Sequence, residues 1–166
     1  MAINVSAAQL SQGNFAQQVA ATLAEYQLDP SVLEIELTES MIMGNFDESL
    51  AQMTELRDLG VRLSIDDFGT GYSSLSYLHR LPIQTIKVDQ SFVRAMDADV
   101  STRPLVEAIV AAARSLKCNV IAEGVETDMQ RRELSRMGCD HMQGYFFGKP
   151  LPAEHAVTPF LLQLAS

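Results

Sequence analysis

Residues 64–78 read SIDDFGTGYSSLSYL, a short apolar run that ends in two adjacent aspartates and continues into a segment rich in glycine and serine. Two neighbouring carboxylates repel each other, and an unpaired carboxylate resists burial. Aspartate and glycine are common in turns, so a solvated turn is the simpler interpretation of Asp66 and Asp67. The other interpretation is a cation-binding site where a strand gives way to a loop.

The composition predicts one globular domain. The chain has 166 residues, of which 47% are hydrophobic, and its formal net charge of -9 argues against a broad contact with DNA or RNA. Its N-terminus does not resemble a signal peptide, and no apolar run approaches the ~20 residues of a membrane span. Cys118 and Cys139 have no CxxC spacing, which favours reduced core thiols. We therefore expect a cytoplasmic protein without a membrane segment in this chain.

Short β-like runs alternate with helical patterns along the whole chain. Strands are expected at residues 2–6, 32–38, 61–66, 83–89, 118–123 and within 139–145. Helices are expected at about residues 14–26, 46–60, 72–79, 104–116, 127–138 and 152–164. Strands that alternate with helices form parallel sheets through crossover connections. The sequence therefore predicts an α/β fold.

Polar side chains occur at or near the carboxyl end of each expected strand. They are Asn4, Glu36, Asp66, Lys87, Glu123 and Gln143. In a closed parallel barrel these ends converge on one mouth, where active sites are built. The shared position favours a ring of carboxylates and amides that needs cations to be stable.

Each of these residues also has a simpler explanation. Glu36 fits a solvated edge charge, and Lys87 fits a surface pair with Asp89. Glu123 and Glu126 fit charges at a helix N-terminus, which the helix dipole favours. Their occurrence at successive strand ends favours a site over these separate explanations.

The chain resembles the EAL domains, bacterial phosphodiesterases that hydrolyse cyclic di-GMP. The resemblance lies in NVSAAQL, ELTES, DDFGTGYSSLSYL, IKVDQSFV, AEGVET and GCDHMQGYFFGKP, in this order, and covers nearly all of residues 1–166. It implies a TIM-barrel-like fold, of which about six of eight parallel strands are present. It also implies metal-dependent hydrolysis of cyclic di-GMP to linear pGpG, with Mg²⁺ or Mn²⁺ in a two-metal site.

The resemblance implies a role for each matched residue. The implied metal ligands are Asn4, Glu36, Asp66, Asp67 and Glu123. Lys87 matches the lysine that holds the attacking water, and Gln143 matches a polar residue that lines the catalytic site with Glu123 and Asp67. The implied supporting residues are Glu39, which anchors the loop after Asp67, together with Glu126, Gly69, Thr70 and Gly71.

Two features depart from the family pattern. Gln90 stands where the family usually has arginine, so a local ion pair is expected to be missing. The Glu-Ala-Leu segment that names the family, and two strands, would precede Asn4, and we expect this chain to lack them. Three interpretations stay open: a cyclic di-GMP phosphodiesterase, an impaired EAL fragment that acts as a binding module, and an unrelated metal-dependent barrel enzyme acting on sugar phosphates.

The missing strands and the family resemblance also predict interactions with other chains and domains. Unpaired strand edges recruit other chains, so we expect a homodimer. The resemblance also implies that the chain is part of a larger multidomain signalling protein.

Overall fold

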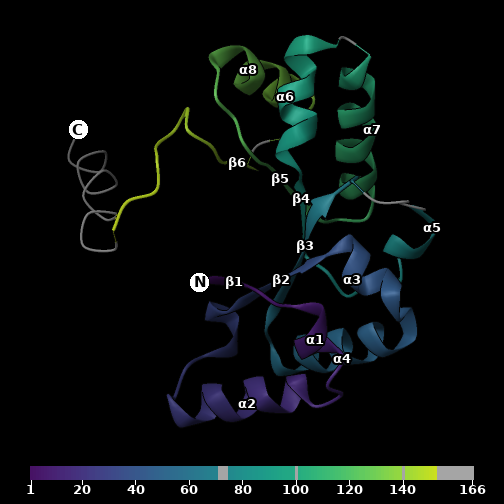
Figure 1. Ribbon diagram of the computed structural model, residues 1–166, viewed down its shortest axis with the longest axis vertical. Coiled ribbons are helices and arrows are strands. Elements are labelled where there is room, and N and C mark those ends of the chain that lie inside the picture. Colours follow the sequence, from purple (N-terminus) through teal and green to yellow (C-terminus); the bar gives the residue numbers. More distant parts are fainter. Residues whose placement is uncertain (71–74, 100, 140, 153–166) are drawn as a thin grey trace.

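The computed structural model describes residues 1–70, 75–99, 101–139 and 141–152 (Figure 1). Gly71 and nearly all of the helix expected at residues 152–164 lie outside these ranges.

A parallel sheet of six strands forms the centre of the described structure, as predicted. The strands are β1 (Ala2–Asn4), β2 (Glu34–Thr38), β3 (Arg62–Phe68), β4 (Thr85–Val88), β5 (Asn119–Ala122) and β6 (His141–Met142). Their order in the sheet is their order in the chain, and every neighbouring pair is parallel. Right-handed crossovers that all advance in one direction place the helices on one face, as in a TIM barrel.

Helices connect the strands. They are α1 (Ala7–Leu10), α2 (Phe15–Glu25), α3 (Glu39–Gly44), α4 (Phe46–Leu59), α5 (Leu75–Leu78), α6 (Gln90–Ala98), α7 (Thr102–Ser115) and α8 (Asp128–Arg136), with a 3₁₀ turn at Pro30–Val32. The sequence did not predict α1, α3 or α6. The capping box that Thr127 and Gln130 form at the start of α8 is confirmed. None of the described helices combines the length and apolar character needed to cross a membrane.

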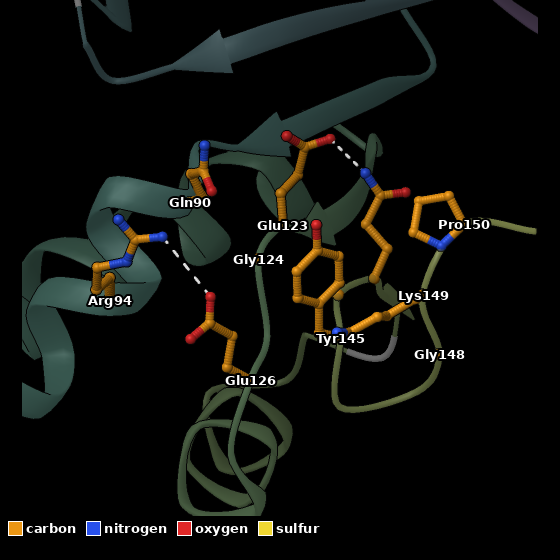
Figure 2. Close-up of a pocket in the computed structure, with 11 residues that line it drawn as sticks. Gln90, Arg94, Glu123, Gly124, Glu126, Tyr145, Gly148, Lys149 and Pro150 are labelled. Carbon is orange, nitrogen blue, oxygen red and sulfur yellow. Dashed lines mark hydrogen bonds and ion pairs between the residues drawn. The ribbon is translucent and has the colours of Figure 1, made fainter.

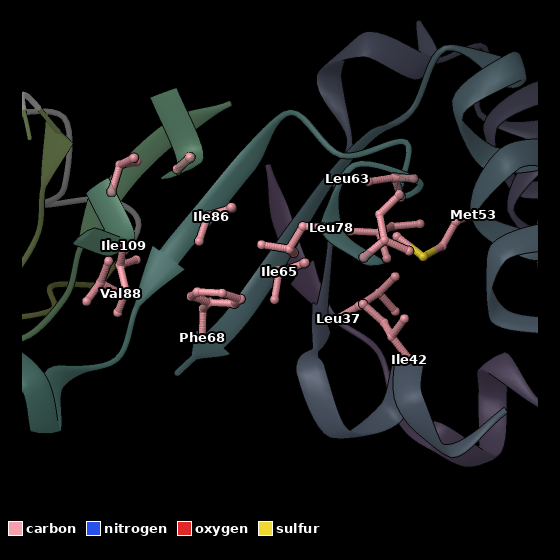
Figure 3. Close-up of a cluster of buried hydrophobic side chains, with 14 of the residues drawn as sticks. Leu37, Ile42, Met53, Leu63, Ile65, Phe68, Leu78, Ile86, Val88 and Ile109 are labelled. Atoms are coloured by element: carbon pink, nitrogen blue, oxygen red, sulfur yellow. The ribbon is translucent and has the colours of Figure 1, made fainter. Parts of the chain in front are cut away.

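Alternation along the strands separates an apolar face from a polar one. Ile35, Leu37, Leu63 and Ile65 are fully buried, and Figure 3 shows the cluster in which this side of the sheet meets α4. The residues between them in sequence point to the opposite face. That face carries buried polar side chains, namely Glu36, Ser64, Thr85 and Lys87. In a barrel it is the lumen, so the fold directs these polar groups inward.

The two free thiols agree with the prediction for the cysteines. Cys139 is buried in the core and Cys118 is half-buried. Strands β1 and β6 form the edges of the described sheet. The homodimer expected from such edges stays a prediction.

Candidate metal and active site

A bulge in β3 explains how two adjacent aspartates serve one site. In a regular strand Asp66 and Asp67 would point to opposite faces. Strand β3 instead runs on to Phe68, and its register with β4 shifts between Ile65 and Phe68. Asp67 has a φ of 53°, in the left-handed region. The bulge cancels the alternation, so both carboxylates reach the same cluster. The expectation that the strand ends at Asp66 was therefore short by two residues.

Hydrogen bonds hold this turn in its strained conformation. The left-handed conformation costs a residue with a side chain about 1–2 kcal/mol. The hydroxyl of Thr70 donates to the carbonyl of Asp67 at 2.9 Å, and the amide of Gly69 donates to Glu39 Oε2 at 3.4 Å. Gly69 has a φ of 100°, and a Cβ there would lie 2.8 Å from the ring of Phe92. The turn therefore requires glycine at residue 69.

Lys87 is the centre of the polar face. Its Nζ lies 2.9 Å from Glu36 Oε2, 3.0 Å from Asp66 Oδ1 and 2.8 Å from Glu123 Oε1. The lysine side chain is only 8% exposed. A buried ammonium needs partners of this kind to offset its lost hydration. The simpler explanation of Lys87, a surface pair with Asp89, was wrong. Asp89 instead caps α6 by accepting the amide of Ser91 at 2.9 Å.

The charges in the cluster do not balance. Glu36, Asp66, Asp67 and Glu123 bring four carboxylates to one ammonium. Burial raises the pKa of Glu123, and the nearby Asp66 and Glu36 raise it further against the opposing effect of Lys87. Burial, Asp66 and Asp89 likewise raise the pKa of Asp67. Burial lowers the pKa of Lys87, but its hydrogen bonds to Glu123, Glu36 and Asp66 outweigh burial and raise it overall. The excess negative charge favours a bound cation.

The oxygen donors fit a hard divalent ion. One carboxylate oxygen from each of Asp66, Asp67 and Glu123 lies within 4.8 Å of the other two. Carboxylate oxygens are the ligands that Mg²⁺ and Mn²⁺ prefer. Gln143 donates from Nε2 to Glu123 Oε1 at 2.6 Å, which orients that carboxylate. Asn4 is exposed and lies opposite Glu36 in the register of β1 with β2. The structure therefore brings the carboxylates together and places Asn4 on the neighbouring strand.

Metal affinity is expected to fall on mild acidification. The raised pKa values of Asp67 and Glu123 mean that protons compete for these oxygens above the ordinary carboxylate range. Below a ligand's pKa, each pH unit lowers metal affinity about tenfold for each proton displaced. Calorimetric Mn²⁺ titrations at pH 7.5, 6.5 and 5.5 measure this dependence. An affinity that stays constant over this range would contradict proton competition at these two carboxylates.

A pocket of about 620 Å³ opens beside Glu123. Figure 2 shows it between α6 and the loop after β6, with Gln90 and Arg94 on one side and Tyr145, Lys149 and Pro150 on the other. The Nζ of Lys149 lies 5.5 Å from the centre of the Tyr145 ring. The pocket therefore joins the carboxylate cluster to an aromatic surface with a nearby positive charge.

Gln90 was expected to leave the chain without one local ion pair, and the structure has another ion pair nearby. Glu126 is paired with Arg94 on α6, at 3.7 Å between Oε1 and a guanidinium nitrogen (Figure 2). Arg94 lies one helical turn after Gln90, so it reaches the same region from the same helix face. Both side chains are at least half exposed, so the pair contributes little to stability.

Sequence reasoning missed four residues of this region: Tyr77, Asp89, Arg94 and Tyr145. Asp89 follows Lys87 by two residues, so strand parity was a signal that it points to the same side. Tyr77 and Arg94 act through contacts with residues distant in sequence, Glu39 and Glu126. No local pattern signals such contacts.

Comparison with known proteins agrees with this geometry. The EAL domain model matches residues 1–150. The signaling protein YkoW of Bacillus subtilis is 46% identical over 93% of this chain, and the bifunctional diguanylate cyclase/cyclic di-GMP phosphodiesterase MucR of Pseudomonas aeruginosa is 44% identical over 95% of it. The matches cover 19% and 23% of these two relatives, so the chain spans about a fifth of their length.

Solved structures are also similar. The PaMucR phosphodiesterase in complex with c-di-GMP has a TM-score of 0.89 at 44% identity, over 93% of this chain and 62% of that one. The EAL domain of Mycobacterium smegmatis DcpA has a TM-score of 0.88 at 37% identity, over 97% of this chain and 72% of that one. With the family match over residues 1–150, the bulged pair of aspartates and the buried lysine, the chain belongs to the EAL domain family.

Proposed function

We propose that this chain carries the catalytic centre of a cytoplasmic phosphodiesterase that hydrolyses cyclic di-GMP to linear pGpG in bacterial second-messenger signalling. The observation that carries the proposal is the contact of Lys87 with Glu36, Asp66 and Glu123, beside Asp67 and next to a pocket. The named activity of MucR and the c-di-GMP complex of PaMucR support this substrate.

The residues that would hold Mg²⁺ or Mn²⁺ are Asn4, Glu36, Asp66, Asp67 and Glu123. When bound, a pair of divalent ions would lower the pKa of water and stabilise the negative charge that develops on the phosphate. Asp67 is held by the bulge, and Glu123 by its hydrogen bond to Gln143. Both carboxylates are thus oriented before a ligand arrives, which favours catalysis by preorganisation.

Lys87 acts as a cationic hydrogen-bond donor in this proposal. Its raised pKa keeps the side chain protonated at neutral pH, so it cannot accept the proton of the attacking water. An ammonium has three donors, which here face Glu36, Asp66 and Glu123, so orienting a water would require one of these carboxylates to turn from Lys87 toward a bound cation. The reaction adds one water across one phosphodiester bond. A P–O bond breaks, leaving a 5′-phosphate and a 3′-hydroxyl.

The pocket beside Glu123 provides a place for the nucleotide. Tyr145 is 62% exposed, so its ring is available for stacking on a base. Stacking of this kind contributes about 1–3 kcal/mol for each base. Lys149, close to the same ring, adds a positive charge that favours a phosphate nearby. This arrangement supports a substrate that combines bases with phosphodiesters.

Binding without hydrolysis is the second candidate. The match covers 62% of the PaMucR phosphodiesterase chain, so part of that protein's domain has no counterpart in the aligned region. A ligand supplied from the remaining part would be needed for turnover but not for binding. In either case we propose that the chain acts within a larger multidomain protein, because the matched relatives extend far beyond it.

A hydrolysis assay separates the two candidates. The chain is incubated with cyclic di-GMP and Mn²⁺ beside a chimera carrying about 80 further N-terminal residues of the MucR domain, the length of two strand-helix units. Formation of pGpG by either protein supports the phosphodiesterase. Saturable binding of cyclic di-GMP with no pGpG from either protein would support the binding module and contradict catalysis. EDTA is the control, and it is expected to stop hydrolysis.

A further inference from the structure

A buried tyrosine is attached to the turn that carries the aspartates. Tyr77, on α5, is 7% exposed, and its hydroxyl donates to Glu39 Oε1 at 2.8 Å. The other oxygen of Glu39, Oε2, accepts the amide of Gly69 at 3.4 Å. The carboxylate of Glu39, at the start of α3, therefore links Tyr77 to the backbone two residues after Asp67.

Packing against a neighbouring aromatic ring holds the ring of Tyr77 in place. It packs edge-to-face on Phe46, with ring centres 5.9 Å apart, and the guanidinium of Arg80 lies 4.6 Å from the centre of the Phe46 ring. Phe46 begins α4, which packs on the sheet through Met53 and Leu56. Contacts outside residues 66–70 therefore help to position the ring of Tyr77.

The long contact to Gly69 depends on how Glu39 is held. An N–H···O distance of 3.4 Å is well beyond the usual 2.9–3.0 Å, so this bond weakens further with a small rotation of the carboxylate. The 2.8 Å bond from the Tyr77 hydroxyl has the usual length of an O–H···O bond, and it limits that rotation. This support matters for Asp67, because its φ of 53° lies in the left-handed region, which residues with a side chain adopt at some energetic cost.

We propose that Tyr77 is a positioning residue for the metal centre. Through Glu39 and Gly69 it fixes the bulge in which Asp66 and Asp67 face one ion. This role rests on the proposed function, since it requires that the carboxylates bind a divalent cation. It links the site through these contacts to α4 and α5.

The test is Mn²⁺ binding by the chain, measured calorimetrically for Tyr77→Phe, Glu39→Ala and the double variant. Removal of one charge-assisted hydrogen bond is expected to raise the Kd about five- to tenfold in Tyr77→Phe. The double variant is expected to bind no more weakly than Glu39→Ala, because both changes disconnect the same link. Glu39→Ala itself is expected to lose less affinity than Glu36→Ala, which removes a ligand. Tyr26→Phe is the matched control, since Tyr26 is 66% exposed at the end of α2.

Thermal unfolding of each variant without metal separates positioning from folding. A lower Tm in Tyr77→Phe with unchanged Kd would show a purely structural tyrosine and overturn the role. Additive losses of affinity in the double variant would overturn it as well. Absence of Mn²⁺ binding by the unsubstituted chain would instead overturn the metal centre of the proposed function, and the role of Tyr77 with it.

Discussion

Replacing Asp66 with alanine is expected to abolish Mn²⁺ binding by the chain and to lower hydrolysis by the extended chimera by at least about a thousandfold. Asp66 is both a member of the carboxylate group that fits a cation and a direct partner of Lys87 at 3.0 Å. Its removal therefore disturbs the ion and the lysine together. Glu36→Ala is expected to have a comparable effect, because Glu36 contacts the same ammonium at 2.9 Å.

The double variant gives the sharper result. Residues that act as one unit are strongly non-additive, so Asp66→Ala with Glu36→Ala is expected to be hardly worse than either single change. The control is Asp58→Ala, since Asp58 is exposed on α4 and pairs with the adjacent Arg57. Initial rates of cyclic di-GMP hydrolysis are compared for the two single variants, the double variant and the control. Losses that multiply would contradict a shared site.

Replacing Lys87 with methionine is expected to destabilise the metal-free chain by about 3–5 kcal/mol, because it leaves buried carboxylates without their cation. Methionine keeps most of the volume of the lysine stem, so the loss reports charge and not a cavity. Mn²⁺ is expected to restore part of the stability, since it supplies positive charge to Glu36, Asp66 and Glu123. Urea unfolding with and without Mn²⁺ measures both effects.

The folding stability of the Lys87→Met variant is expected to depend on pH. Burial already raises the pKa of Glu123 and Lys87 opposes this rise, so loss of Lys87 is expected to raise the folded-state pKa of Glu123 further above its unfolded value. Groups with a raised folded pKa add stability as the pH falls toward that pKa. The methionine variant is therefore expected to regain stability between pH 7.5 and pH 5.5. Lys117→Met is the control, since Lys117 is exposed. Equal stability of the Lys87 variant and the unsubstituted chain at pH 7.5 would contradict the central position of Lys87.

Strand alternation made much of the fold and site readable from sequence. The six parallel strands and their polar carboxyl ends follow from short apolar runs and from parity. Helix α6 was missed because the expected strand was continued through Asp89, which in the structure caps this helix by accepting the amide of Ser91. An aspartate just after an apolar run fits both a strand end and a helix cap, and only the structure separates them.

Two features of the site were beyond local patterns. The partners of Lys87 include Glu36, which lies 51 residues away in sequence, so only the sheet brings them together. The bulge at Asp66 and Asp67 also has no signature in an apolar run that ends in charged residues, because the shift appears only in the pairing with β4. Parity alone would have placed one of the two aspartates on the wrong face.

Anomalous diffraction from crystals of the chain grown with Mn²⁺ tests the metal centre most directly. Asp66, Asp67 and Glu123 already hold oxygens within 4.8 Å of one another, so we expect an anomalous peak among them. We expect this peak to be absent from the Asp66→Ala variant under the same conditions. Mn²⁺ peaks found only elsewhere on the molecule, with Lys87 still in contact with Glu36, Asp66 and Glu123, would contradict a metal centre at these carboxylates.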